Sequence, residues 1–237
     1  MQLPFEQFPA LSAIKICRHV FAQRIPGVDV SHDKAEVLER LDAAHHEIRN
    51  ATGFGDWPMF TAEQVHGNKI SVIDEVGSAL RADRRRHGVA FLPDRVFPGC
   101  DGIITNQRCV ALGTYVADCC AVYIVDLKTP AIGSVHSGRK GTELGVITNA
   151  IRQMIGRFGS DPANMIVQLS PCIRPPYYEV DFAAEISRQC RAFGVQYIHD
   201  PGTCTACDLG RFYSYRAEKR KTGRMLAVLG LDSTIPN

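Results

Sequence analysis

Cys119 and His136 are far apart in the chain, yet the residues between them predict that they meet in space. Residues 120–126 (CAVYIVD) are apolar and β-branched, residues 127–130 carry turn signals, and residues 131–135 are apolar again, which is the pattern of a β-hairpin. With the turn centred near Lys128 and Thr129, residue 119 lies opposite roughly residue 138, at the open end of the hairpin. A thiol and an imidazole held together there are either a nucleophile with its base or two ligands of a soft metal.

A third residue, His66, favours the metal. The strand-like run 59–65 ends just before it, Gly67-Asn68 forms a turn, and alternation resumes over residues 69–76. His66 is therefore expected at a strand end, from which a loop can deliver it to the same rim. Two imidazoles and one thiolate suit zinc or copper, and three protein ligands leave one coordination position open for water or substrate.

The elements that must position these residues can be read from the apolar periodicity. Helices are predicted over residues 35–49, 142–158 and 182–193, and further strands over 103–105, 110–116, 165–169 and 225–229. Because helices and strands interleave without strict βαβ order, we expect an α+β fold, a layered sandwich of mixed sheets with flanking helices in a single domain over residues 1–237. The basic, polar segment 76–99 is predicted to be a surface loop, with a binding loop as the alternative.

The segment 137–142 links the strand ending at His136 to the predicted helix 142–158. A Gly-containing basic loop at a helix N-terminus favours anions, and Lys140 adds a point charge. Phosphate bound there, beside an open metal position, would suit phosphorolysis. The alternative is that Arg139 and Lys140 simply face solvent.

The overall composition restricts the classes of partner. With 237 residues and 45% hydrophobic content the chain can bury a large core. A net charge of +2 gives no reason to expect nucleic acid or an anionic membrane as a partner. The N-terminal residues lack a signal-peptide pattern, and nine scattered cysteines argue against a disulfide framework, so a cytoplasmic protein is expected. The expected oligomeric state is a monomer or a homodimer.

Six short motifs occur in order along the chain. They are Gln64-Val65-His66-Gly67, Asp101-Gly102-Ile103-Ile104-Thr105, Ala117-Asp118-Cys119, the segment 136–141, Pro171-Cys172-Ile173 with Tyr178-Glu179-Val180, and the C-terminal strings 204–205, 212–216 and 222–224. With these motifs the chain resembles the YfiH family of laccase-domain or polyphenol oxidase-like proteins, over about residues 20–231. The resemblance implies that His66, Cys119 and His136 bind zinc.

The resemblance also implies an activity. Members of the family cleave purine nucleosides such as adenosine, inosine and methylthioadenosine with phosphate, and deaminate adenosine. Arg24 and Arg216 fall near family motifs and, with Gln64 and Lys140, are candidates for contacts to substrate or phosphate, although a structural ion pair is the alternative for either arginine. Asp118 is a candidate acid or base. A laccase mechanism with four coppers is not expected, because the chain has eight histidines and no His-x-His, although one copper could occupy the site.

The chain departs from the family pattern at several positions. Arg139 and Lys140 replace a Trp-Arg pair, Ala121 replaces a proline, and Ser170 replaces a glycine. These changes bear on the choice of substrate, since Arg and Lys are not interchangeable at a bidentate anion site.

Three hypotheses follow. The first is a zinc-dependent nucleoside phosphorylase and deaminase. The second is a metal-free hydrolase or amidase that uses Cys119 and His136, with peptidoglycan editing as a setting that the family also suggests. The third is a non-catalytic metal-binding or partner-binding protein. A structural zinc is not expected at the lone Cys204-x-x-Cys207 pair, because it would need further ligands, and Cys204 is assigned to packing or to a pocket wall.

Overall fold

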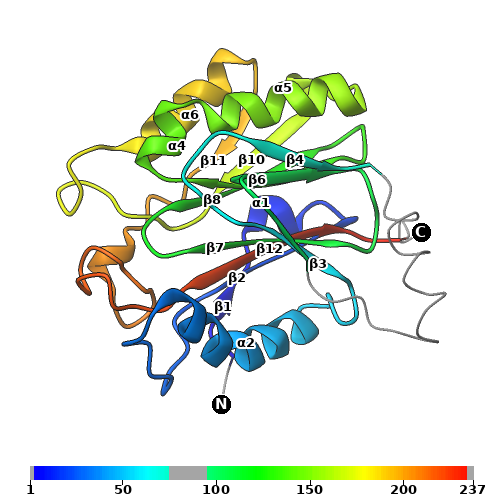
Figure 1. Ribbon diagram of the computed structural model, residues 1–237. Coiled ribbons are helices and arrows are strands. Elements are labelled where there is room, and N and C mark those ends of the chain that lie inside the picture. Colours follow the sequence, from blue (N-terminus) through cyan, green and yellow to red (C-terminus); the bar gives the residue numbers. More distant parts are fainter. Residues whose placement is uncertain (1–2, 75–94, 234–237) are drawn as a thin grey trace.

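The computed structural model describes residues 3–74 and 95–233, which form two stacked six-stranded sheets with helices on the outer faces (Figure 1). Sheet A has the strand order β1 (Phe5–Glu6), β2 (Cys17–Ala22), β12 (Met225–Leu231), β7 (Ala111–Val116), β3 (Met59–Ala62), β5 (Arg95–Phe97). Sheet B has the order β11 (Tyr197–His199), β10 (Met165–Leu169), β8 (Cys120–Asp126), β9 (Ile132–Ser137), β6 (Gly102–Thr105), β4 (Ile70–Ile73). Both sheets mix parallel and antiparallel pairs, so the predicted α+β sandwich of mixed sheets is confirmed.

The helices cover opposite sides of the two-sheet stack. Helices α4 (Arg139–Glu143), α5 (Val146–Phe158) and α6 (Phe182–Ala192) lie over sheet B, and α2 (Lys34–Ala51) lies under sheet A (Figure 1). The short α1 (Pro9–Ser12) and two 3-10 turns, Pro162–Asn164 and Thr205–Cys207, complete the described secondary structure. Among residues 3–74 and 95–233, no helix has the length and apolar character needed to span a bilayer.

Strand β8 explains why residues 120–126 read as a continuous apolar run. Ala121, Tyr123 and Val125 pack into the core between the sheets, whereas the alternate residues 120, 122 and 124 pack into the core beneath α5 and α6. A strand that is buried on both faces needs apolar side chains at every position rather than at every second one.

The predicted hairpin register is confirmed. Cys120 pairs with Ser137 and Ala121 with His136 in the antiparallel β8–β9 ladder, which extrapolates to residue 119 opposite residue 138. The first site residue of the hairpin therefore lies directly before β8, and the second lies near the end of β9.

Two of the three predicted helices are confirmed and the third is divided. Helix α2 begins after Asp33, whose carboxylate accepts the N–H groups of Ala35 and Glu36, and α6 ends before Gly194. The continuous helix expected over residues 142–158 is wrong, because Gly145 adopts a left-handed φ of 73° and separates α4 from α5.

Some strands differ from the expectation. The run 59–65 yields a strand only to Ala62, and β2, which lies between β1 and β12, was not predicted. The predicted surface loop 76–99 falls mostly outside the described residues; its last part forms the edge strand β5.

Two buried histidines give the fold a pH dependence. Burial lowers the pKa of His19 and of His45 to about 4. Between the ordinary histidine pKa of about 6.5 and pH 4 the unfolded chain binds protons that the folded chain does not, so stability is lost as the pH falls through this window. We expect each histidine to cost about 2–3 kcal/mol across it. Urea unfolding of the chelator-treated protein at pH 7 and pH 5 measures this loss.

The control for this prediction is the exposed neighbour His46. His45→Leu should make the stability less dependent on pH, whereas His46→Gln should leave the dependence unchanged. Equal pH dependence in wild type and His45→Leu would contradict the assignment.

Candidate metal centre

Three side chains from separate segments converge at one end of sheet B. His66 comes from the loop between β3 and β4, Cys119 directly precedes β8, and His136 lies on β9. One ligand atom from each lies within 4.8 Å of the other two. The Cys119 Sγ is 3.9 Å from the Nε2 of His66, and the two imidazole rings lie 4.8 Å apart at 85°. The predicted convergence of these three residues is confirmed.

Asp101, at the start of β6, fixes the position of both histidines. Its carboxylate accepts the backbone N–H groups of His66 at 2.8 Å and Gly67 at 2.7 Å, and lies 2.9 Å from Nδ1 of His136. This aspartate is fully buried. Because Nδ1 of His136 is engaged by the carboxylate, Nε2 is left to face the site, an arrangement that is typical of metal-binding histidines.

The backbone around the site adopts uncommon conformations. Gln64, His66 and Asp118 have positive φ angles of 65°, 61° and 83°. Non-glycine residues occupy this region at a cost in free energy, and such residues cluster at functional sites when their surroundings hold them in place. At His66 the carboxylate of Asp101 supplies that restraint.

The charges within the trio support one another. Burial disfavours the thiolate, but the imidazoles of His136 and His66 outweigh it and lower the pKa of Cys119. Burial likewise disfavours the imidazolium, yet the Cys119 thiolate and the Asp101 carboxylate raise the pKa of His136. The metal-free trio therefore favours a thiolate beside an imidazolium, and a cation held by the thiolate and the two imidazoles would displace the proton of His136.

Gly138 has no side chain, and the Cys119 thiol occupies the space that a side chain there would need. A Cβ atom at this position would lie 2.6 Å from the Cys119 Sγ, closer than nonbonded carbon and sulfur atoms approach. The glycine that follows β9 is therefore needed for close packing against the site, in addition to its place at the start of α4.

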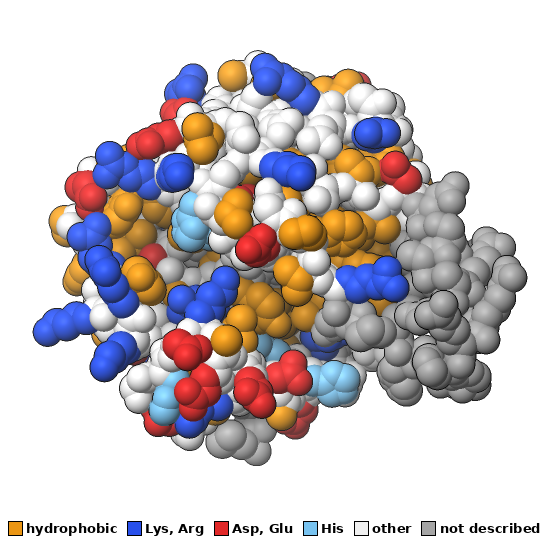
Figure 2. Space-filling model, in the orientation of Figure 1, with side chains coloured by type: hydrophobic (Ala, Val, Ile, Leu, Met, Phe, Trp, Pro, Cys, Tyr) orange, Lys and Arg blue, Asp and Glu red, His pale blue; other side chains and the backbone are white. Residues whose placement is uncertain are grey.

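The trio lies in the wall of a cavity of about 910 Å³. Aromatic side chains and seven lysines and arginines contribute to its lining. Besides the trio, the lining residues are Lys34, Gln64, Tyr115, Ala117, Asp118, Arg139, Lys140, Glu143, Ile173, Tyr178, Phe182, Tyr215, Arg216, Lys219, Arg220 and Arg224. Figure 2 shows Lys and Arg side chains around a hollow on the side of the molecule where α4 lies in Figure 1. The volume and the lining suit a small aromatic ligand with an anionic partner.

Four of the residues predicted to contact substrate or act on it line this cavity. Lys140 is exposed at its rim, and Gln64 is held by two hydrogen bonds to the backbone of Tyr115, at 2.5 and 3.0 Å. The guanidinium of Arg216 donates to Glu179 at 3.0 Å. Both carboxylate oxygens of Asp118 are occupied, one by the Thr205 hydroxyl and one by the backbone N–H of Arg216. The proposed acid or base role of Asp118 stays a prediction.

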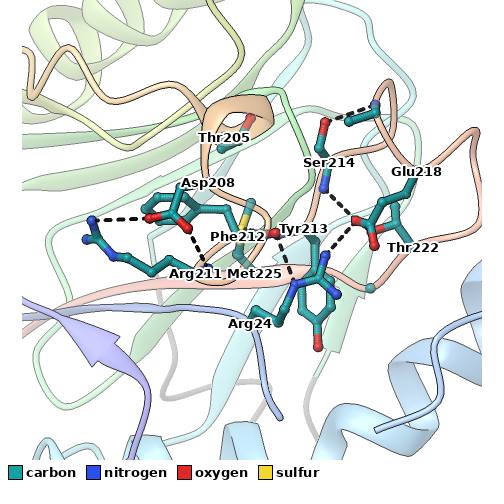
Figure 3. Close-up of polar contacts among 12 residues, drawn as sticks. Arg24, Thr205, Asp208, Arg211, Phe212, Tyr213, Ser214, Glu218, Thr222 and Met225 are labelled. Carbon is teal, nitrogen blue, oxygen red and sulfur yellow. Dashed lines mark hydrogen bonds and ion pairs between the residues drawn. The ribbon is translucent and has the colours of Figure 1, made fainter. Parts of the chain in front are cut away.

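Arg24 does not line the cavity and instead supports the loop that does. Its guanidinium pairs with Glu218 at 2.7 Å, donates to the carbonyl of Phe212 at 3.1 Å, and lies 4.3 Å from the ring centre of Tyr213 (Figure 3). Glu218 also accepts the N–H of Ser214 and the hydroxyl of Thr222. This network fixes the segment 214–224, which presents Tyr215, Arg216, Lys219, Arg220 and Arg224 to the cavity.

Two departures from the family pattern are in contact. The N–H of Ala121, where the family has proline, donates to the hydroxyl of Ser170, where the family has glycine, at 2.9 Å. Proline has no N–H to satisfy and glycine offers no acceptor, so the two replacements compensate for each other.

This contact predicts a coupled effect on stability. Ser170→Gly leaves a buried N–H without a partner and should lower the free energy of unfolding by about 1–3 kcal/mol. Ala121→Pro together with Ser170→Gly removes both groups and should recover much of that loss. A double-mutant cycle by urea denaturation measures the coupling; additive effects of the two changes would contradict it.

Three further residues of the site escaped sequence reasoning. Asp101 was recognised only as part of a motif, and Lys34 and Arg224 were assigned no role. A carboxylate just before a predicted strand was the available signal for Asp101. No local sequence pattern predicts that Lys34 lines the cavity, because the other lining residues come from segments far from it in the sequence.

The fold and the site together define a two-sheet α+β protein with a His-Cys-His centre at the wall of a cationic cavity. The chain belongs to the family described as multi-copper polyphenol oxidoreductase laccase, whose sequence model matches residues 18–187 and 178–232. The resemblance to the YfiH family is thereby confirmed.

Relatives and solved structures agree with this assignment. The chain is 26% identical to the purine nucleoside phosphorylase YlmD of Geobacillus stearothermophilus, covering 89% of this chain and 84% of that protein. It is 29% identical to a purine nucleoside phosphorylase of Corynebacterium glutamicum, covering 90% and 94%. The crystal structure of Bacillus licheniformis YfiH superposes with a TM-score of 0.76 at 20% identity, covering 97% and 99% of the two chains.

Proposed function

We propose that this protein is a zinc-dependent purine nucleoside phosphorylase that also deaminates adenosine. It takes adenosine, inosine or methylthioadenosine with phosphate, and releases the purine base and the sugar 1-phosphate. The observation that carries the proposal is the meeting of His66, Cys119 and His136 in the wall of a cationic, aromatic-lined cavity. The names of relatives that are similar over most of their length support the choice of reaction.

The donor set fits zinc. Two imidazoles and a thiolate are common zinc ligands, and the carboxylate behind His136 is the partner that zinc-binding histidines usually have. Copper is the alternative ion for the same three donors. His66, Cys119 and His136 would hold the ion, and a bound zinc ion would supply Lewis-acid chemistry.

The remaining residues bind and orient the reactants. Tyr178, Phe182 and Tyr215 offer rings against which a purine can pack, and the positive charges of Lys140 and Arg216 attract an anionic reactant into the cavity. In phosphorolysis a phosphate oxygen bonds to C1′ of the sugar, the glycosidic C–N bond breaks, and its electron pair leaves on the purine nitrogen, which takes up a proton. In this proposal Gln64 and Asp118, both fixed by hydrogen bonds in the cavity wall, have the task of orienting the nucleoside.

Phosphate dependence tests the proposal. The zinc-loaded protein is incubated with adenosine, with and without phosphate, and the products are separated by chromatography. We expect adenine and ribose-1-phosphate only when phosphate is present, and inosine from deamination in either case. Free ribose, or no base release from any of the three nucleosides, would overturn the phosphorylase assignment.

The same geometry also favours a second candidate, a metal-free cysteine hydrolase or amidase. Cys119, His136 and Asp101 stand in the order nucleophile, base and orienting carboxylate. Activity on peptides or amides that survives chelation but is lost on alkylation of Cys119 would favour this candidate over the phosphorylase. If the metal-loaded protein turns over no nucleoside, peptide or amide, the remaining hypothesis is a non-catalytic metal-binding or partner-binding protein.

A further inference from the structure

The cations of the cavity are of two kinds. Arg139 and Arg216 are already paired, since both reach Glu179 and the former also reaches Glu143. The other five lysines and arginines of the cavity wall have no ion pair within residues 3–74 and 95–233: Lys34, Lys140, Lys219, Arg220 and Arg224. Their positive charges are thus not neutralised by the described part of the chain.

Of these five, Lys34 and Arg224 lie close enough for their like charges to interact unfavourably. Lys34 is the first residue of α2, and Arg224 directly precedes β12. Partial burial lowers the pKa of Lys34, and the charge of Arg224 lowers it further. Burial also lowers the pKa of Arg224, whose side chain is half-buried. Lys34 is exposed and Arg224 is half-buried, and two like charges close together are unfavourable unless something negative joins them.

Three carboxylates, those of Glu63, Asp101 and Asp118, interact electrostatically with Lys34 or Arg224, but each is hydrogen-bonded to other groups. Glu63 accepts the backbone N–H of Gly99 at 2.7 Å, and Asp101 is bound to His136 and to two backbone N–H groups. Asp118 accepts one hydroxyl and one backbone N–H. No described carboxylate therefore comes within ion-pair distance of either cation.

Arg224 is held ready for a ligand. Its Nη1 donates to the carbonyls of Thr222 at 3.0 Å and Gly223 at 2.8 Å, and its guanidinium lies 5.7 Å from the ring centre of Tyr215. Among the described residues, its Nε and Nη2 have no hydrogen-bond partner. A guanidinium fixed on one side and open on the other is suited to an oxyanion.

We propose that Lys34 and Arg224 form an anion subsite that binds a phosphate group. The inference rests on the proposed function, because a phosphorylase must hold phosphate in this cavity. It assigns that task to the start of α2 and to the residue before β12; α2 lies under sheet A, whereas α4, which carries Lys140, lies over sheet B (Figure 1). The same chemistry would accept inorganic phosphate or the phosphate monoester of a nucleotide.

Calorimetric titration of the zinc-loaded full chain tests the subsite without turnover. The two probes are inorganic phosphate and adenosine 5′-monophosphate. Lys34→Gln should weaken binding of at least one probe about tenfold, the loss of one charge-assisted hydrogen bond, whereas Lys34→Arg should bind within about threefold of wild type. The matched control is Lys128→Gln, which removes one exposed charge at the β8–β9 turn and should change nothing.

The outcomes separate this inference from the proposed function. If Lys34→Gln weakens the binding of inorganic phosphate, with or without that of the nucleotide, free phosphate is a ligand of the subsite. If it weakens the binding of the nucleotide alone, the ligand is a phosphate monoester. Either result upholds the subsite even if no nucleoside is cleaved. Unchanged binding in Lys34→Gln with weakened binding in Lys140→Gln would overturn it, as would no binding of either probe to wild type. Phosphorolysis with an unaltered KM for phosphate in Lys34→Gln would also overturn it, while leaving the proposed function intact.

Discussion

Cys119→Ser is expected to lose bound zinc and, with it, nucleoside phosphorolysis. Serine is a poor zinc ligand at neutral pH, because its hydroxyl stays protonated where the Cys119 thiol, with its lowered pKa, ionises. Metal-ion catalysis is worth several kcal/mol of transition-state stabilisation, which corresponds to a loss of about 10³-fold or more in kcat/KM. Elemental analysis after dialysis and a phosphorolysis assay measure the two effects.

The matched control for this change is Cys207→Ser, at an exposed cysteine away from the trio. It should keep full zinc content and full activity. One zinc per chain in purified Cys119→Ser would show that the thiol is not a ligand. Full zinc loss without loss of activity would instead separate the metal from the reaction.

Asp101→Asn is expected to weaken zinc binding about 10- to 100-fold without removing a ligand. Aspartate accepts from two backbone N–H groups and from Nδ1 of His136, while an amide offers only one acceptor oxygen and would set its NH₂ against a donor. The side chain is fully buried, so the unmatched donors should also lower the free energy of unfolding by about 1–3 kcal/mol.

Two measurements distinguish a positioning role from a general loss of stability. Competition with a zinc-binding dye gives the affinity, and urea unfolding of the chelated protein gives the stability. Asp56→Asn, an exposed change of the same chemistry, should alter neither. A destabilised Asp101→Asn protein with wild-type zinc affinity would show that the carboxylate supports the fold but does not orient His136.

The hairpin was predictable because its information is local. A seven-residue apolar strand, a polar turn and a second apolar strand fix one register, and that register places Cys119 beside residue 138. Gly194, which has a positive φ, likewise marks the end of α6, because helix capping depends on neighbouring residues.

The remainder depends on contacts between distant segments. Strand β2 reads CRHVFA, without clean alternation, and becomes a strand because it pairs with β1 and β12. Gly145 interrupts a well-formed helical pattern because it adopts a left-handed φ. A glycine within a helical pattern does not always do so, and the sequence pattern alone therefore did not reveal the break. The carboxylate of Asp101 reaches the backbone of His66 in a loop and the ring of His136 on β9. Lys34 and Arg224, which are far apart in the sequence, line the same cavity.

Anomalous scattering at the zinc edge from crystals of the zinc-loaded protein tests the central claim most directly. The account predicts one strong peak bonded to the Nε2 atoms of His66 and His136, at about 2.0–2.1 Å, and to the Sγ of Cys119, at about 2.3 Å. A map without density between these three atoms, or with zinc bound only elsewhere on the chain, would contradict it.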